Sequence, residues 1–401
     1  MDMSEKFKLC IAGKNNIAVD VLEYVLKNKI FSNDEIVVVC NRTEDGRNTW
    51  QKSLRYFAKL WQVKEVSLED VYNLKDIYFL SLEFDRIIRP EKFQTRHLYN
   101  IHFSKLPQYK GCFTAIMPLL NREKVSGVTF HRMNAGIDTG EIIDQIEFPI
   151  HSNDTARDLY FKCLSYGTEL VIHQLPKIKS NNNLFGVMQG AIGASYYSKN
   201  AIDFSAELID VKKTASEICA QLRAFIFREY QLPKINGKNV VKAEITAIPS
   251  CNPPGTIIWQ DEWRGIMATI DYDIVIYWDA FAYVMREAAD GNLDNLCKVP
   301  HLECYVNQSE EHGWTPLIVA AYHGYYEAFM LLVANGAELQ QRNWNGTTLL
   351  MYAKDGWRKN KDGRIFQYLK QRGLSLDDID YSGKCLKDYC TDEEWMFLSS
   401  L

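Results

Sequence analysis

A repeat in the last third of the chain restricts the possible folds more than any other feature of the sequence. The segment GWTPLIVAAYHGYYEAFMLLVANGAEL begins at Gly313, and its glycine, threonine and leucine pattern returns at Gly346, a step of 33 residues. Such a unit cannot bury its apolar face alone, so neighbouring units must stack. Ala280–Leu296 fits a preceding helix pair, and Gly383 would begin a shortened terminal unit. An all-helical stack is therefore predicted at the C-terminal end.

The period, the TPL that opens a helix and the NGA that closes the pair resemble ankyrin repeats. In ankyrin arrays the turn tips usually bind partners, and Trp314 and Trp344 lie at or beside these tips. Exposed tryptophan is uncommon without a use. The sequence leaves three interpretations open: a docking surface for a partner protein, an accessory nucleotide-sugar site in which indole stacks on the base, or packing between repeats.

Short β-rich runs alternate with helical patterns over the first 150 residues, which predicts an α/β unit with a largely parallel sheet. A long amphipathic helix, Thr155–Ile178, closes this unit. The predicted strands are Phe7–Ala12, Ile36–Cys40, Ile77–Leu82, Leu98–Phe103, Val128–Met133 and Glu141–Ile150.

The chain changes character after the loop-like tract Lys177–Asn183. One helix around Thr214–Phe227 is followed by strand runs that NGK, NPPG and DEW turns separate, which indicates a small, mostly β domain. We therefore expect three domains: an α/β catalytic domain over 1–180, a β-rich domain over 190–278 and the repeat domain over 279–401.

Charge and composition exclude several classes of function. The 46 basic and 51 acidic residues give a net charge of -5, and nine basic against ten acidic residues between 194 and 278 argue against an RNA-binding module. No apolar run approaches the roughly 20 residues that cross a bilayer, and the start MDMSEKFKLCIAG lacks a signal peptide's apolar segment. The ten cysteines are scattered without a CxxC pair, and the histidines form no metal-binding motif. We expect a cytoplasmic protein with no metal, no nucleic-acid partner and no membrane contact.

The side chains with the clearest chemistry are Asn100 and His102, in NIHFSKLPQYKG, and Asp138, in GIDTG. Asn100 and His102 are two apart at the end of a predicted strand, so they point to the same side of the sheet. Open α/β sheets bind their ligands at such strand ends. These groups suit acyl transfer to an amine: His102 as base, Asp138 orienting and stabilising the imidazole, and Asn100 donating to the developing oxyanion. Spacing alone also permits three unrelated residues, since positions thirty-six apart need not meet.

NIHFSKLPQYKG, HRMNAGIDTGEIID and FLSLEFDRIIRPEKF closely resemble the formyltransferases that use 10-formyltetrahydrofolate. The motif FSKLPxYKG and the segment IAGKNNIAV near the start are similar to sequences of the branch that formylates nucleotide-linked amino-deoxysugars. The resemblance covers roughly Phe7–Trp278. It implies a Rossmann-like catalytic domain with Asn100, His102 and Asp138 as its catalytic set. Relatives that act on glycinamide ribonucleotide or methionyl-tRNA usually have proline or glycine at the position of Phe103, which disfavours both substrates.

The same resemblance implies residues for the cofactor and the substrate. The 10-formyltetrahydrofolate pterin would lie against Leu80, Leu82, Gly136 and Asp138, although isolated leucines fit core packing equally well. The turn AGKNN is neither GxGxxG nor a Walker loop, yet it could face a diphosphate or a sugar hydroxyl. The predicted substrate-binding residues are Lys14, Asn15, Asn16, Lys105, Tyr109, Lys110, Phe225, Arg228 and Tyr230, with Arg228 for phosphate and Phe225 or Tyr230 for base stacking.

These observations predict a sugar N-formyltransferase. It would move a formyl group from 10-formyltetrahydrofolate to the amine of a dTDP-linked 3-amino-3,6-dideoxyhexose or 4-amino-4,6-dideoxyhexose, for surface polysaccharide (O-antigen), and the family resemblance favours a homodimer. Two alternatives remain open at this point. One is a methionyl-tRNA formyltransferase, and the other is an ankyrin-based binding module with an inactive catalytic unit.

Overall fold

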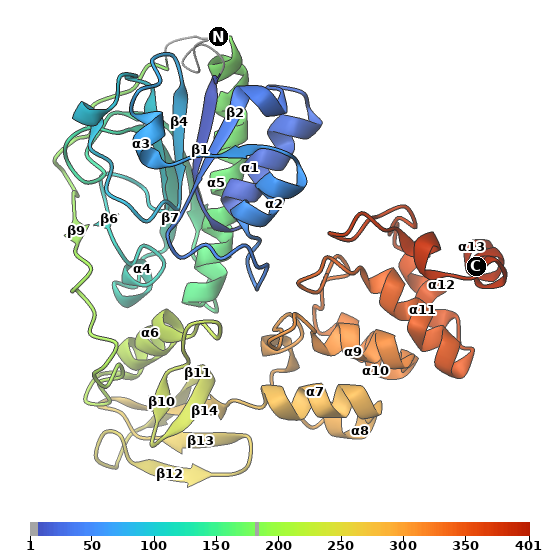
Figure 1. The fold of residues 1–401 in the computed structure, drawn as a ribbon. Coiled ribbons are helices and arrows are strands. Elements are labelled where there is room, and N and C mark those ends of the chain that lie inside the picture. Colours follow the sequence, from blue (N-terminus) through green and yellow to red (C-terminus); the bar gives the residue numbers. More distant parts are fainter. Residues whose placement is uncertain (1–6, 181–183) are drawn as a thin grey trace. The chain divides into compact units, whose positions relative to one another are not determined.

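The computed structural model describes residues 7–180 and 184–401, which form two compact units, 1–233 and 234–401 (Figure 1). The expected helical region around 215 belongs to the first unit, and the β-rich stretch from 234 shares the second unit with the repeats. Residues 1–6 and 181–183, which include the start of the chain and the end of the loop-like tract Lys177–Asn183, lie outside the described residues. The division into three domains stays a prediction.

The first unit is built on a seven-stranded sheet in the order β3-β2-β1-β4-β5-β7-β8. The first five strands in that order are parallel, whereas β7 runs antiparallel to β5 and β8 antiparallel to β7. The predicted largely parallel sheet is thus present, with an antiparallel hairpin at one edge. Its strands are β1 (Leu9–Gly13), β2 (Ile36–Cys40), β3 (Lys64–Glu65), β4 (Tyr78–Leu82), β5 (Leu98–His102), β7 (Val125–Arg132) and β8 (Ile142–Pro149).

Helices cover both faces of this sheet, as Figure 1 shows, and every residue of β1, β2 and β4 is therefore buried. Two alternate residues of β1, Cys10 and Ala12, pack in one core cluster with Leu68 and Val71 of α3. The opposite face packs against α1 and α5. The helices of this unit are α1 (Asn15–Lys27), α2 (Leu54–Leu60), α3 (Leu68–Val71), α4 (Met117–Leu120), α5 (Ala156–Lys179) and α6 (Ala215–Phe225); β6 (Lys110–Gly111) pairs with β9 (Tyr196–Tyr197).

The predicted long helix is α5, and its N-terminal end has a capping box. Thr155 accepts a hydrogen bond from the Asp158 amide, and the Asp158 carboxylate accepts one in return from the Thr155 amide. This reciprocal cap satisfies donors that the first helical turn leaves open. Because α5 packs on α1, β5 and β7, it also presents Tyr160 near the carboxyl ends of the parallel strands.

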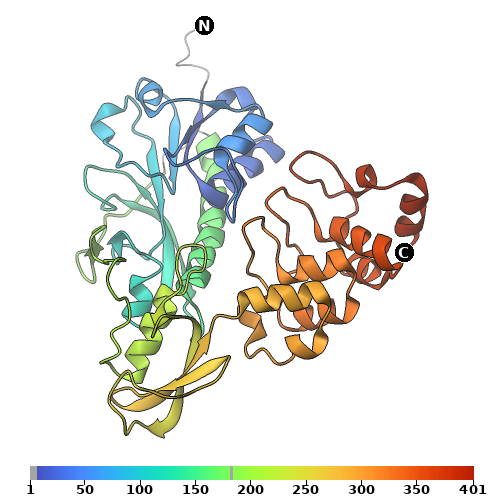
Figure 2. The same cartoon turned by 60° about the horizontal axis from the view of Figure 1, so that its bottom comes forward.

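The second unit begins with a five-stranded sheet in the order β10-β11-β14-β13-β12. Repeats follow it as helix pairs, which Figure 2 shows side by side in orange and red. Thr315 and Thr348 cap the first helices of two successive repeats, 33 positions apart, as the sequence period predicted. The elements are β10 (Lys234–Ile235), β11 (Lys238–Pro249), β12 (Ile257–Gln260), β13 (Arg264–Met267), β14 (Tyr272–Trp278), α7 (Phe281–Asp290), α8 (Leu293–Leu296), α9 (Pro316–His323), α10 (Tyr326–Ala334), α11 (Leu349–Asn360), α12 (Arg364–Gln371) and α13 (Asp392–Ser400).

This architecture confirms the predicted fold class: a Rossmann-like α/β unit, a mostly β region and helical ankyrin repeats. Within the residues that the structure describes, no helix is long and apolar enough to span a membrane.

Candidate active site

The three predicted catalytic side chains meet at the carboxyl end of β5. Strand β5 lies between β4 and β7, with Ser81 and His131 paired to Asn100 on its two sides. His102 is the last residue of β5, and Asp138 comes from the loop that joins β7 to β8. The loop therefore returns the carboxylate to the strand end, where an open α/β sheet binds its ligands.

The hydrogen bonds of His102 determine which ring nitrogen can act as a base. Its Nε2 lies 2.8 Å from the Tyr109 carbonyl oxygen, and Nδ1 lies 3.5 Å from Oδ2 of Asp138. A carbonyl can only accept, so in the neutral ring Nε2 carries the hydrogen and Nδ1 presents a lone pair. Burial lowers the pKa of His102, and this effect outweighs the opposing charge of Asp138. The neutral ring can accept a proton at Nδ1, beside the carboxylate that stabilises the resulting cation.

Asp138 is held as a carboxylate by three neighbours. The Gly111 amide donates to Oδ2 at 2.9 Å, and His131 Nε2 lies 3.6 Å from Oδ1. Burial by itself would raise the pKa of Asp138, but His102, His131 and the Gly111 amide lower it to about 2. The group stays charged throughout the physiological pH range.

The backbone of the 133–141 loop shows how the sequence places that carboxylate. Asp138 itself has a left-handed φ of 52°, which aspartate tolerates better than most residues. The flanking glycines act mainly through close packing: a Cβ on Gly140 would lie 1.7 Å from the Arg132 carbonyl oxygen, and one on Gly136 2.2 Å from Thr139 Oγ1. GIDTG thus forms a tight turn with its left-handed conformation at the aspartate.

A second histidine orients Asn100. In the neutral form of His131, Nδ1 donates to the Arg132 carbonyl at 2.9 Å and Nε2 accepts from Asn100 Nδ2 at 3.1 Å. One amide hydrogen of Asn100 is thereby engaged, and the second can serve an oxyanion. His131 is one of the histidines that form no metal-binding motif, and the sequence pattern assigned it no catalytic role. Its place on the strand paired with β5 was a usable signal, because paired residues on one face lie close together.

The residues predicted at the folate lie around the same strand ends. Leu80 and Leu82 are fully buried in β4, so their side chains belong to the interior. The Leu82 carbonyl accepts a hydrogen bond from the Lys14 amide at 3.3 Å, and Gly136 is exposed on the Asp138 loop. The assignment of these residues to the cofactor stays a prediction.

The two asparagines of the turn after β1 form hydrogen bonds within the protein. Asn15 Nδ2 donates to Glu83 Oε2 and to the Tyr160 hydroxyl oxygen, both at 3.1 Å. Asn16 Oδ1 accepts from the Lys52 amide at 2.9 Å, which joins this turn to the segment before α2. Lys14 is half-buried at the N-terminal end of α1.

The other predicted substrate residues differ in accessibility. Lys105 pairs with Glu147, and the buried Tyr109 donates from its hydroxyl to Glu123 at 2.7 Å. Tyr230 is 60% exposed and its ring lies 5.5 Å from Trp50, in an edge-to-face contact. The remaining three are Lys110, half-buried at the start of β6; Phe225, buried beside Phe204; and Arg228, half-buried.

Both tryptophans proposed for an accessory site pack between repeats. The Trp314 ring lies 5.1 Å from Tyr322 and 4.9 Å from Tyr352. A Cβ on Gly313 would come within 2.4 Å of the Trp344 ring. These contacts account for the half-buried state of both rings. A ligand site at the two tryptophans stays a prediction.

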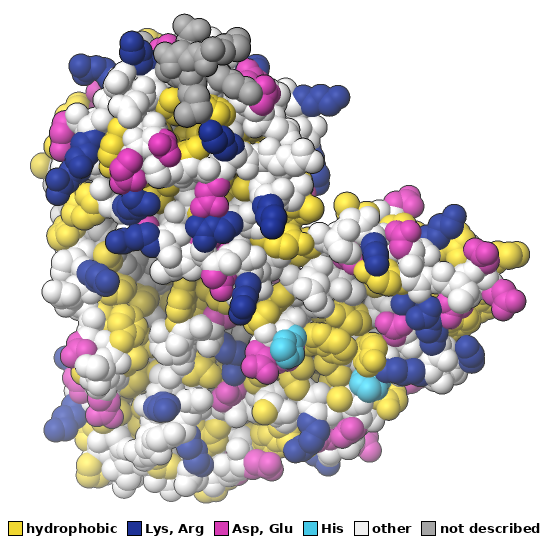
Figure 3. Space-filling model, in the orientation of Figure 1, with side chains coloured by type: hydrophobic (Ala, Val, Ile, Leu, Met, Phe, Trp, Pro, Cys, Tyr) yellow, Lys and Arg dark blue, Asp and Glu magenta, His cyan; other side chains and the backbone are white. Residues whose placement is uncertain are grey.

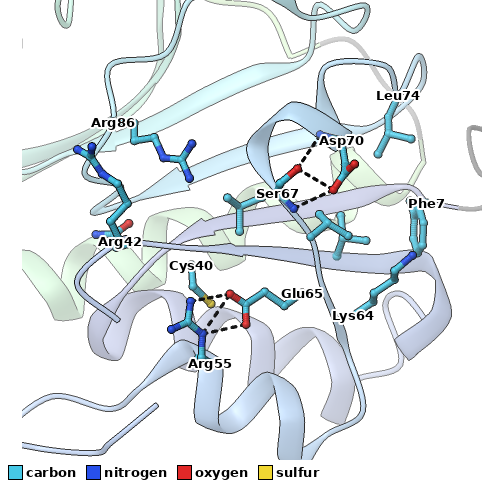
Figure 4. Close-up of a pocket in the computed structure, with 14 residues that line it drawn as sticks. Phe7, Cys40, Arg42, Arg55, Lys64, Glu65, Ser67, Asp70, Leu74 and Arg86 are labelled. Carbon is cyan, nitrogen blue, oxygen red and sulfur yellow. Dashed lines mark hydrogen bonds and ion pairs between the residues drawn. The ribbon is translucent and has the colours of Figure 1, made fainter. Parts of the chain in front are cut away.

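A cavity of about 550 Å³ lies against β2, β3 and α3 (Figure 4). Arg55 pairs there with Glu65 at 2.8 Å, and the hydroxyl of Ser67 donates to Asp70 at 2.7 Å. None of the site residues predicted from the sequence lines this cavity. Its charged lining residues are Arg42, Arg55, Lys64, Glu65, Asp70 and Arg86.

Comparison with known proteins identifies relatives of each unit. Residues 69–175 match the Formyl transferase family model, and residues 284–380 match a model of three ankyrin repeats. The N-formyltransferase from Helicobacter canadensis, solved with folinic acid and dTDP-3-aminofucose, is 47% identical over 68% of this chain and 100% of its own, with a TM-score of 0.63. WlaRD, a sugar 3N-formyl transferase solved with dTDP and 5-N-formyl-THF, is 46% identical over 68% of this chain and 98% of its own, also with a TM-score of 0.63.

Methionyl-tRNA formyltransferases match more distantly. The one from Fervidobacterium nodosum is 26% identical over 54% of this chain and 71% of its own length. The one from Methylacidiphilum infernorum is 37% identical over 31% of this chain and 38% of its own length. The chain thus spans well under two thirds of the second of these relatives.

Proposed function

The chain belongs to the sugar N-formyltransferase family, and from this premise we propose that it transfers a formyl group from 10-formyltetrahydrofolate to the amine of a dTDP-linked 3-amino-3,6-dideoxyhexose. The observation that supports this chemistry best is the neutral His102, whose Nδ1 lies 3.5 Å from the charged Asp138. The 3-amino acceptor follows the two solved relatives, one a sugar 3N-formyl transferase and one solved with dTDP-3-aminofucose.

The proposed reaction needs no covalent enzyme intermediate. The amine attacks the formyl carbon, Asn100 donates to the developing oxyanion through its second amide hydrogen, and His102 Nδ1 takes the proton that the amine loses. Asp138 stabilises the imidazolium. On collapse of the tetrahedral intermediate the folate nitrogen leaves, and the proton on His102 can return to it.

A mass-spectrometric panel tests this proposal. The purified chain is incubated with 10-formyltetrahydrofolate and dTDP-sugars that bear the amine at carbon 3 or at carbon 4. We expect a gain of one formyl group on the 3-amino sugar and none with His102→Asn. Formylation of the 4-amino sugar alone would refute the proposed acceptor, and no formylation of either sugar would refute the function.

The same panel includes methionyl-tRNA, because relatives with that activity match the chain. On the face of the molecule that Figure 3 shows, Lys and Arg side chains are interspersed with Asp and Glu. RNA binding would instead require a basic surface. Formylation of methionyl-tRNA in preference to amino sugars would establish the alternative.

Assembly and cellular role complete the proposal. Large apolar side chains of the second unit's sheet region are exposed, which supports a homodimer: Ile245 49%, Ile248 58%, Ile258 42%, Trp259 46%, Ile270 57% and Tyr272 44%. Light scattering of the purified chain measures its oligomeric state directly.

We also propose a cellular role. The chain would be a cytoplasmic enzyme that supplies a formylated sugar for O-antigen, with a protein or nucleotide ligand at the repeats.

A further inference from the structure

Residues 184–197, which we call the strap, lie against both backbone segments that surround the catalytic pair. Val187 of the strap exchanges backbone hydrogen bonds of 2.8 and 2.9 Å with Ile142, where β8 begins directly after the loop that carries Asp138. At the other end of the strap, β9 pairs in parallel with β6, which lies shortly after His102 in the chain (Figure 1). The strap thus joins the two segments that must come together at the site.

Gln189 of the strap holds the Asp138 loop through its backbone. Its Nε2 donates to the carbonyl oxygens of Asp138 and Gly140, both at 2.8 Å. Because carbonyls only accept, these bonds fix which end of the amide faces the loop. Asp138 has a left-handed φ of 52°, a conformation that persists where the surroundings of a residue hold it. Gln189 supplies two such contacts, at Asp138 and two residues beyond it.

Ser195 of the strap holds the backbone around Tyr109. The Tyr109 amide donates to Ser195 Oγ at 2.8 Å. The Ser195 amide donates to the Pro107 carbonyl at 3.2 Å, and the Ser195 carbonyl accepts from the Lys110 amide at 2.9 Å. Tyr109 itself has a left-handed φ of 58°. Three hydrogen bonds to one serine therefore fix the main chain at Tyr109 and on both sides of it.

The backbone segments that the strap holds are direct partners of the catalytic pair. The Tyr109 carbonyl accepts from His102 Nε2 at 2.8 Å, which leaves Nδ1 as the basic nitrogen. The Gly111 amide donates to Asp138 Oδ2 at 2.9 Å, which orients the carboxylate. The strap thereby reaches His102 through one carbonyl, and Asp138 through both its backbone and its carboxylate.

Hydrogen bonds rather than apolar packing hold the middle of the strap. Phe185, Met188 and Ile192 are 87%, 72% and 97% exposed, so their burial contributes little. The end of the strap is fixed independently, because the Tyr197 ring stacks on Tyr109 at 5.8 Å. Removal of one polar side chain of the strap should therefore loosen the catalytic pair without detaching the strap.

We propose that Gln189 and Ser195 are positioning residues for formyl transfer, which hold from one strap the backbone partners of His102 and Asp138. This inference rests on the proposed function, which makes that pair the proton acceptor and its stabilising charge. Gln189 acts through the backbone of the Asp138 loop, and Ser195 acts through the Tyr109 peptide. Their side chains have no part in the proton transfer itself.

The acid limb of the kcat profile reports how firmly the pair is held. Burial lowers the pKa of His102, and Asp138 and the Tyr109 carbonyl oppose that change. The titratable groups that face His102 are Asp138 and His131. A loosened partner opposes the effect of burial less, so the pKa of His102 falls further. The neutral ring then persists to lower pH, and the acid limb moves in that direction.

Gln189→Ala removes both bonds to the Asp138 loop. We expect kcat to fall about tenfold or more, the acid limb to move to lower pH, and the Kd of the dTDP-linked amino sugar to stay within about twofold. Steady-state kinetics across the pH range and calorimetric titration measure these quantities. Met188→Ala, at the neighbouring exposed position of the strap, is the matched control and should change none of them. If Gln189→Ala does not fold, Gln189→Met keeps the length of the side chain without its donors and carries the same expectation.

Ser195→Ala removes the acceptor of the Tyr109 amide, whereas Ser195→Thr keeps a hydroxyl. We expect the alanine variant to lose about tenfold in kcat and the threonine variant to stay within about threefold of the wild-type chain. Nitrogen-15 NMR of the histidine-labelled chain without substrates reports the tautomer of His102, whose signal is the one missing from His102→Asn. The hydrogen should lie on Nε2 in the wild-type chain, and Ser195→Ala should populate the Nδ1–H tautomer.

A loss of kcat with an equal loss of affinity and an unmoved acid limb would overturn the inference, since the strap would then only stabilise the fold. Wild-type kcat and pH profile in both alanine variants would overturn it as well. Failure of the wild-type chain to formylate any amino sugar would instead refute the proposed function, and the tautomer of His102 would still test whether Ser195 positions that ring.

Discussion

Protonation of His102 decides how the proposed transfer depends on pH. The residue is 7% exposed, and burial lowers its pKa below the usual 6.5. Because the neutral ring is the active form, a lowered pKa extends activity toward lower pH. The rate is then lost as pH falls through that lowered value, while Asp138, with a pKa of about 2, remains charged.

His102→Asn should lower kcat by about 10²–10⁴-fold, because the amine loses its general base. Asparagine preserves a polar group at the strand end, so affinity for the nucleotide sugar should remain within a few fold. Steady-state kinetics and calorimetric titration measure the two quantities. Near wild-type turnover would show that another group is the base.

Asp138→Asn should slow the reaction by about 10²-fold or more and move the acid limb of the kcat profile to lower pH. The amide oxygen can still accept from the Gly111 amide, but it removes the charge that stabilises the His102 cation. Kinetics between pH 5 and 9 are the measurement, with Asp20→Asn on α1 as control. A shift toward higher pH would contradict the assigned electrostatic role.

At the scale of elements, the connection between β7 and β8 carries the catalytic carboxylate. Gly140 lies so close to the Arg132 carbonyl that any side chain must displace one of them. The geometry of Asp138 therefore depends on a glycine that makes no contact with substrate in the proposed mechanism.

Gly140→Ala should destabilise the first unit by about 1–3 kcal/mol and reduce turnover even where the protein remains folded. Gly190→Ala is the matched control, because a Cβ there meets no atom within 4 Å. Thermal unfolding and activity below the transition check both effects. Equal behaviour of the two variants would mean that the loop adapts to a side chain.

At the scale of the whole molecule, the two units have separate cores. Helix caps offer a way to perturb one unit at a time: Thr155 caps α5 in the first, and Thr315 caps α9 in the second. Loss of such a cap lowers the free energy of unfolding by about 1 kcal/mol.

Calorimetry of the chain should show two unfolding transitions. Thr155→Ala and Thr315→Ala should each lower a different one, by about 2–4 °C. Formyl transfer measured below both transitions should persist in Thr315→Ala, since the proposed catalytic groups belong to the first unit. A single transition that both variants shift equally would show that the units unfold together.

Local sequence patterns determined many of the secondary-structure elements of this protein and which side chains share a face. The 33-residue period predicted the stacked helix pairs, and strand alternation placed Asn100 and His102 on one side of β5, because both properties depend on neighbours in sequence. Tertiary structure alone decided which distant groups meet. Glu83 and Tyr160 are 77 positions apart, and His131 reaches Asn100 across 31. Contacts of that kind depend on how strands pair and helices pack, and no local periodicity encodes them.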